Sequence, residues 1–161
     1  MARHLFLKAR SLVSIFFLIA IMTAAAGCQG AQPQISIENA SAELSPSIYG
    51  EGVVYLTIKN AGGKDTLTGV KVGIPGATAD LHEMRAGLMV IARKMLIPAQ
   101  SVVRLQPMET HIMIENMPKD MKEGFAFTLT LVFERSGEKQ VPLTLQKAKT
   151  PPMPMTHEHH M

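Results

Sequence analysis

The strongest constraint on how this chain can fold is a series of short segments in which apolar and polar residues alternate. The clearest examples are Phe125 to Glu134, FAFTLTLVFE, and Gly52 to Lys59, GVVYLTIK. A period of two places successive side chains on opposite faces of a strand. Asparagine, glycine and proline clusters separate these segments and mark turns. The pattern therefore predicts an all-β sandwich.

Seven further segments carry the same signal of short strands between turns. They cover residues 35–44, 66–73, 78–84, 88–92, 101–106, 111–115 and 139–146. The domain organisation that follows is a signal segment (1–27), a polar tether (28–34), one β-sandwich domain (35–147) and a flexible Met/His-rich tail (148–161). We expect the tail to be disordered, because its prolines and polar residues lack a periodic apolar face.

The N-terminus has the pattern of an export signal. Arg3, Lys8 and Arg10 precede an apolar run at 11–22, too short for a comfortable membrane span. Ala25 to Cys28, AAGC, resembles a bacterial lipobox, which implies lipidation at Cys28 and anchoring on the periplasmic side of a membrane. Cys28 is the single cysteine of the chain, so no internal disulfide can form. The alternative is ordinary signal cleavage that leaves Cys28 as a free thiol.

The basic net charge does not describe the folded part. The formal charge is +3, and three of the 16 Lys and Arg residues lie in the first ten positions. The remaining 13 basic residues balance the 13 Asp and Glu residues. A neutral domain gives no reason to expect a nucleic-acid partner.

Four side chains in the middle of the chain have the chemistry of a copper site: His82, Met89, His111 and Met113. Two imidazoles and two thioethers suit zinc poorly, because zinc prefers thiolate, imidazole and carboxylate. Thioether sulfur is soft and matches Cu(I). The chain has no cysteine in this region for the thiolate of a blue-copper centre, so we expect a copper carrier and no enzyme.

Strand geometry suggests how these four residues could meet. If Arg85 and Ala86 form the turn of the 78–92 hairpin, then His82 lies directly opposite Met89, with Cβ atoms about 4.5–5.5 Å apart. A turn that used Gly87 would shift this register. His111 and Met113 are two residues apart on one strand and share a face.

Part of the chain resembles a known family. The segment from Met95 to Pro107, running into His111-Ile112-Met113, is similar to the periplasmic copper chaperones called PCu(A)C. The family pattern is His, ten residues, Met, 21 residues, His, one residue, Met; here Met89, His111 and Met113 match, but the first gap is six residues. The resemblance implies a cupredoxin-like Greek-key β-sandwich that binds Cu(I) and delivers it to the copper centre of cytochrome oxidase or to another assembly chaperone. Whether His82 or Met84 completes the site stays open.

Other soft ligands give further expectations. Met84 and Met108 are candidate accessory ligands near the core site. The tail could hold Cu(II) or a second Cu(I), through Met153, Met155, His157, His159, His160 and Met161. Two alternatives to a chaperone remain: a copper-resistance buffer dominated by the tail, and an envelope interaction protein that binds no metal. We expect a monomer that contacts the membrane only through its lipid.

Overall fold

The computed structural model describes residues 30–45 and 48–149, and this part of the chain consists of strands, turns and loops. It contains no helix that could span a membrane. The described residues from Gln32 onward belong to one compact unit, and only Gly30 and Ala31 of the remaining N-terminal unit are described. The strands are β1 (Ile35–Leu44), β2 (Gly52–Asn60), β3 (Asp65–Val72), β4 (Thr78–Arg85), β5 (Leu88–Ile91), β6 (Met95–Ile97), β7 (Ser101–Leu105), β8 (His111–Glu115), β9 (Ala126–Phe133) and β10 (Gly137–Gln146).

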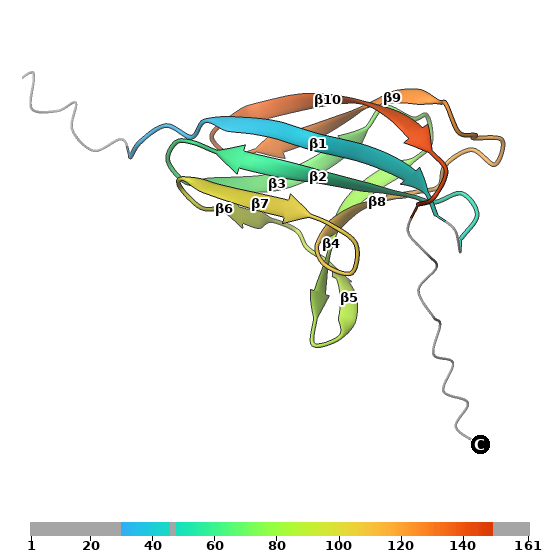
Figure 1. The fold of residues 1–161 in the computed structure, drawn as a ribbon, viewed down its shortest axis with the longest axis horizontal. Helices are drawn as coiled ribbons and strands as arrows, with labels where there is room; N and C mark the ends of the chain where they lie inside the picture. Colours follow the sequence, from blue (N-terminus) through green and yellow to red (C-terminus); the bar gives the residue numbers. More distant parts are fainter. Residues whose placement is uncertain (1–29, 46–47, 150–161) are drawn as a thin grey trace, which may run out of the picture. The chain divides into compact units, whose positions relative to one another are not determined.

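The strands form a sheet that folds over on itself to make the two layers of a sandwich (Figure 1). One layer has the order β5-β4-β8-β2-β1, with β7 beside β2, and the other has the order β10-β9-β3-β6. A short parallel pairing of β1 with β10 joins the layers at Ala42–Leu145 and Glu43–Gln146. The prediction of an all-β sandwich is confirmed. The three-residue strand β6 was missed.

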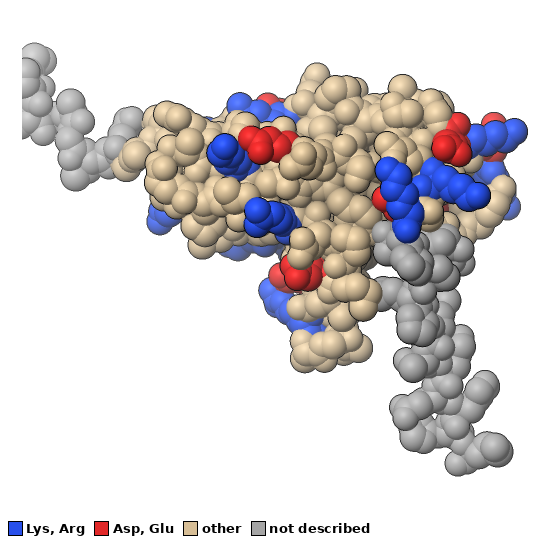
Figure 2. All heavy atoms as spheres, in the orientation of Figure 1, with Lys and Arg blue, Asp and Glu red and all other residues tan. Residues whose placement is uncertain are grey.

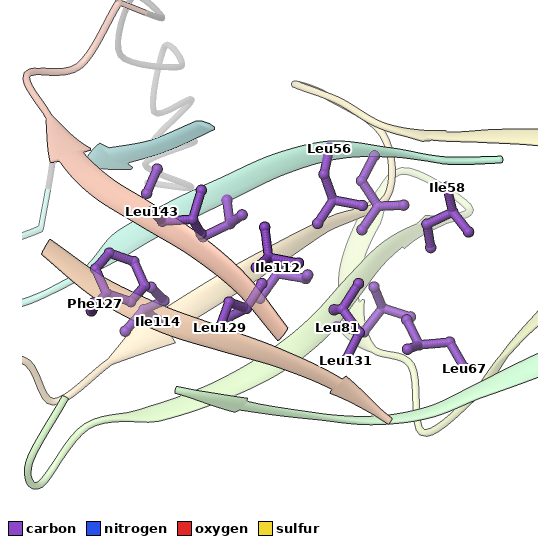
Figure 3. Close-up of a cluster of buried hydrophobic side chains, with 14 of the residues drawn as sticks. Leu56, Ile58, Leu67, Leu81, Ile112, Ile114, Phe127, Leu129, Leu131 and Leu143 are labelled. Carbon is purple, nitrogen blue, oxygen red and sulfur yellow. The ribbon is translucent and has the colours of Figure 1, made fainter. Parts of the chain in front are cut away.

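The core lies between the two layers and is built from one face of each strand. Figure 3 shows these side chains converging, with Ile112 and Leu81 from the first layer and Leu129 and Leu131 from the second. Ile112, Leu129 and Leu131 are fully buried. Alternation along β4 and β8 then turns the residues beside Leu81 and Ile112 to the opposite face, which is where the candidate ligands lie.

The β2–β3 turn is held by the buried side chain of Asn60. Its Oδ1 accepts hydrogen bonds from the backbone N–H of Gln34 (3.1 Å) and of Gly62 (3.0 Å). Its Nδ2 donates to the carbonyl oxygens of Gly63 (2.7 Å) and Pro98 (2.9 Å). One amide therefore ties together the start of β1, the β2–β3 turn and the segment between β6 and β7.

Asp65, at the start of β3, organises the β9–β10 turn in a similar way. Its carboxylate accepts hydrogen bonds from the Ser136 hydroxyl and from the backbone N–H groups of Ser136, Arg135 and Thr66. Burial by itself would raise the pKa of Asp65, but these hydrogen bonds outweigh it and lower the pKa.

Candidate metal centre

Two imidazoles meet on the face of the first layer that points away from the core. His82 on β4 lies directly opposite His111 on β8 in an antiparallel pair. Their ring centroids are 6.0 Å apart, and the ring planes are tilted by 34°. Residues directly opposed in this way share a face of the sheet, so one ion placed between the rings could contact both.

The turn before β8 fixes the orientation of His111. β2 pairs with β8 at its start and with β7 along the rest of its length, and residues 106–110 make the turn between β7 and β8. His111 Nδ1 lies 2.9 Å from the carbonyl oxygen of Glu109 in this turn. A carbonyl can only accept, so Nδ1 carries the hydrogen and Nε2 of the neutral ring keeps its lone pair. A hydrogen bond from the other ring nitrogen to a backbone carbonyl is what commonly orients a metal-binding histidine.

The surroundings of His111 also favour its neutral form. Only 8% of the residue is exposed, and the ring of Tyr55 on β2 meets it edge-on at a centroid distance of 6.3 Å. Burial lowers the pKa of His111, and the nearby His82 lowers it further, against the opposing effect of the Glu109 carbonyl. A neutral imidazole is the form that binds a metal ion. Sequence reasoning overlooked Tyr55, which alternation along β2 places on this face.

His82 presents a nitrogen that is buried without a hydrogen-bond partner. Within the described residues, Nε2 of His82 has no donor or acceptor in reach. A buried polar atom without a partner costs free energy, about 1–3 kcal/mol, and this cost disappears if the atom binds an ion. The position beside His111 makes Nε2 a suitable metal ligand.

Met113 lies on the same face as His111, as strand alternation predicts. It pairs with Val53 on β2 and with Asp80 on β4, two residue pairs along from the two histidines. Its side chain is half-buried. Met113 therefore adds a thioether on the side of the imidazoles that faces the body of the domain.

The predicted pairing of His82 with Met89 is wrong. In the β4–β5 hairpin His82 pairs with Ile91, and Met84 pairs with Met89. The two turn residues are Ala86 and Gly87, which have φ values of 50° and 81°. A two-residue hairpin turn with positive φ at both positions matches the twist of the strands, and Gly87 adopts it without steric cost. Met89 therefore lies diagonally across from His82, where Cβ atoms are about 7–8 Å apart and a long side chain can still reach.

Carboxylates surround the histidines on this layer, and sequence reasoning had not identified them. Glu51 lies just before β2, close enough to Glu115 and His82 to interact electrostatically with both. Burial raises the pKa of Glu51, the neighbouring Glu115 raises it further, and His82 opposes the increase. Asp80 precedes His82 by two residues on the same face of β4. These acidic groups lie where their ionised forms would favour a cation beside the imidazoles.

The remaining candidates lie either outside the strand pairs or outside the described residues. Met108 lies in the 106–110 turn with a φ of 65° and is 59% exposed, outside any strand pair. Cys28 and the tail candidates lie outside the described residues: Met153, Met155, His157, His159, His160 and Met161.

The residues present fit a soft, monovalent metal ion. In the part of the chain that the structure describes, no three His, Cys, Asp or Glu side chains converge on one metal-sized site. The sulfur donors on the same face as the two imidazoles are the thioethers of Met113, Met89 and Met84. Among the common metal ions of proteins, Cu(I) is well matched to thioether sulfur.

Comparisons with known proteins agree with this fold. A family model described as "Putative lipoprotein LpqE-like" matches residues 35–145. The chain is similar to the solved structure "Copper-bound PCuAC domain from PmoF2", with a TM-score of 0.57 and 24% identity over 71% of this chain and 93% of that one. It is also similar to "Apo PCuAC domain from PmoF1", with a TM-score of 0.59 and 22% identity over 71% of this chain and 94% of that one. A third similar structure is that of apo-DR1885 from Deinococcus radiodurans, with a TM-score of 0.50 and 21% identity over 76% and 87% of the two chains.

These likenesses confirm the expected cupredoxin-like β-sandwich. The comparison with curated proteins gave no significant match.

Proposed function

Since this chain belongs to the LpqE-like family and its domain has the fold of PCuAC domains, we propose that it is a copper chaperone. In this proposal Cu(I) is bound by four side chains: His82, Met89, His111 and Met113. The observation that most supports the proposal is the direct pairing of His82 with His111 on one face of the sheet, with ring centroids 6.0 Å apart. A solved structure similar to this chain is a copper-bound PCuAC domain, which gives the proposal independent support.

The ligand set explains why the protein would carry copper and not store it. Imidazole and thioether are neutral, so the bound ion keeps its positive charge and each ligand can exchange without gaining or losing a proton. Thiolates would bind copper more firmly but would have to be reprotonated on release. Neutral ligands at a partly exposed site therefore suit transfer to an acceptor.

We further propose that the protein is an exported, monomeric lipoprotein anchored through Cys28. The description of its family as lipoproteins supports this, as does the AAGC motif at the end of the signal segment. The acceptor would be a protein on the same side of the membrane, such as the copper-binding subunit of cytochrome oxidase or a second assembly chaperone.

Cu(I) titration against a competing chelator tests the binding site. The wild type should bind one ion tightly, and the double variant His111→Ala/Met113→Ala should lose this binding, because it removes an imidazole and a thioether from the same strand face. Met95→Leu, on β6 in the other layer, is the matched control and should bind as the wild type does. Tight one-to-one binding by the double variant would overturn the assignment.

Deleting residues 150–161 separates the chaperone from a copper buffer. A chaperone keeps its single core site after the deletion. A buffer dominated by the tail loses most of its capacity, and that outcome would replace the proposal.

A further inference from the structure

The register of the β4–β5 hairpin creates a second pair of soft ligands beside the histidines. Met84 lies directly opposite Met89, two residue pairs closer to the turn than His82 and its partner Ile91. A shift of the pairing by one residue would place the two sulfur atoms on opposite faces, whereas the observed register places both on one face. The thioether pair is therefore a direct consequence of this register.

The pair shares a face with His82 and reaches toward solvent. Met84 follows His82 by two residues on β4, so alternation places both on one face of the strand. Met84 is 39% exposed, whereas Met89 is half-buried. The hairpin projects from the sandwich in Figure 1, and its end is mostly uncharged on the face seen in Figure 2. The two methionines thus lie between the His82–His111 pair and the solvent-exposed end of the hairpin.

We propose that Met84 and Met89 form an outer thioether pair through which Cu(I) passes between the His82–His111–Met113 site and an acceptor. This inference rests on the proposed copper-carrying function and adds the route that the ion takes. Met89 lies diagonal to His82 and directly opposite Met84, so it can hold the ion at both positions. Met84 then replaces an imidazole as the ion moves outward.

The exchange balances without any co-reactant. One Cu–N bond to an imidazole breaks as one Cu–S bond to the Met84 thioether forms. Both ligands are neutral, copper remains Cu(I), and no proton or electron is transferred. The acceptor's own soft ligand next displaces Met84, whose exposure makes it the most accessible of these sulfur atoms.

Transfer kinetics with Met84→Leu test the route. Leucine has a similar volume and lacks sulfur, so the hairpin should keep its packing. We expect the variant to release Cu(I) to excess bathocuproine disulfonate at least about tenfold more slowly than the wild type. Tenfold is the lower end of the loss in affinity or activity seen when a group that supports a metal site is removed. Equilibrium affinity should fall by a smaller factor than the rate. Met108→Leu, an exposed methionine outside the strand register, should transfer copper at the wild-type rate.

A second measurement checks that the sulfur atoms contact the ion. With less than one equivalent of Cu(I), the ε-methyl resonances of Met84 and Met89 should shift, while those of Met108 and Met95 should stay in place. Wild-type transfer rates in Met84→Leu, an equal slowing in Met108→Leu, or an unmoved Met84 methyl resonance would each overturn the route. If the route fails while His111→Ala/Met113→Ala still abolishes binding, the copper site stands and only the outer pair is wrong.

Discussion

Replacing Asn60 with alanine should remove much of the stability of this domain. The side chain is 2% exposed and makes four hydrogen bonds of 2.7–3.1 Å. A hydrogen bond contributes about 1 kcal/mol net, and more is lost when its partner is left buried and unpaired. Asn60→Ala therefore should lower the free energy of unfolding by about 4 kcal/mol, a large share of the roughly 5–15 kcal/mol that stabilises a typical domain.

Urea unfolding followed by circular dichroism measures this loss as a shift in midpoint at constant slope. Lys59→Ala is the matched control on the neighbouring residue. Lys59 makes an exposed ion pair with Glu38 at 3.8 Å, and such pairs contribute at most about 1 kcal/mol. A loss of less than about 1 kcal/mol in Asn60→Ala would refute the reasoning, because a single hydrogen bond is expected to contribute that much.

Two further predictions concern other turns of the domain. The hydrogen bonds to Asp65 hold its pKa below the ordinary 3.8, so its contribution to stability is present above pH 3.8 and is lost as the pH falls through the lowered pKa. Asp65→Asn should weaken this loss of stability at acid pH, as measured by urea unfolding at several pH values. An unchanged dependence on acid pH would contradict the account. In the hairpin turn, Ala86→Gly should raise the free energy of unfolding by about 1 kcal/mol and Gly87→Ala should lower it by about as much, because a left-handed conformation disfavours residues with a Cβ. The melting temperature should rise in the first variant and fall in the second. The same sign in both variants would contradict the φ values at this turn.

Strand positions could be predicted from the sequence because burial of one face requires alternation. The β8 segment, with Ile112 and Ile114 in the core, is an example, and its bounds were predicted as observed. β6 escaped prediction because three residues before Pro98 are too few to show a period. The common face of His111 and Met113 follows from the same alternation.

The pairing within the hairpin could not be predicted with the same certainty. Alternation places His82, Met84 and Met89 on one face whether residues 85–86 or residues 86–87 form the turn, because the two pairings differ by an even number of residues. Choosing the turn decides which residues are directly opposed, and Gly87 was the signal, since the second position of such a turn favours glycine. The pairing of His82 with His111 depends on how β4 and β8 meet, which no local pattern in either strand specifies.

The contact of β1 with β10 has a consequence for how the protein is made. Residues about one hundred positions apart, Ala42 and Leu145, are neighbours in the parallel pairing that joins the layers. Contacts of such long sequence separation slow folding, because much of the chain must be ordered before they form. A growing chain cannot join its two layers through β1 and β10 until β10 has been synthesised. Completion of the sandwich therefore requires the finished polypeptide and cannot occur on a nascent one.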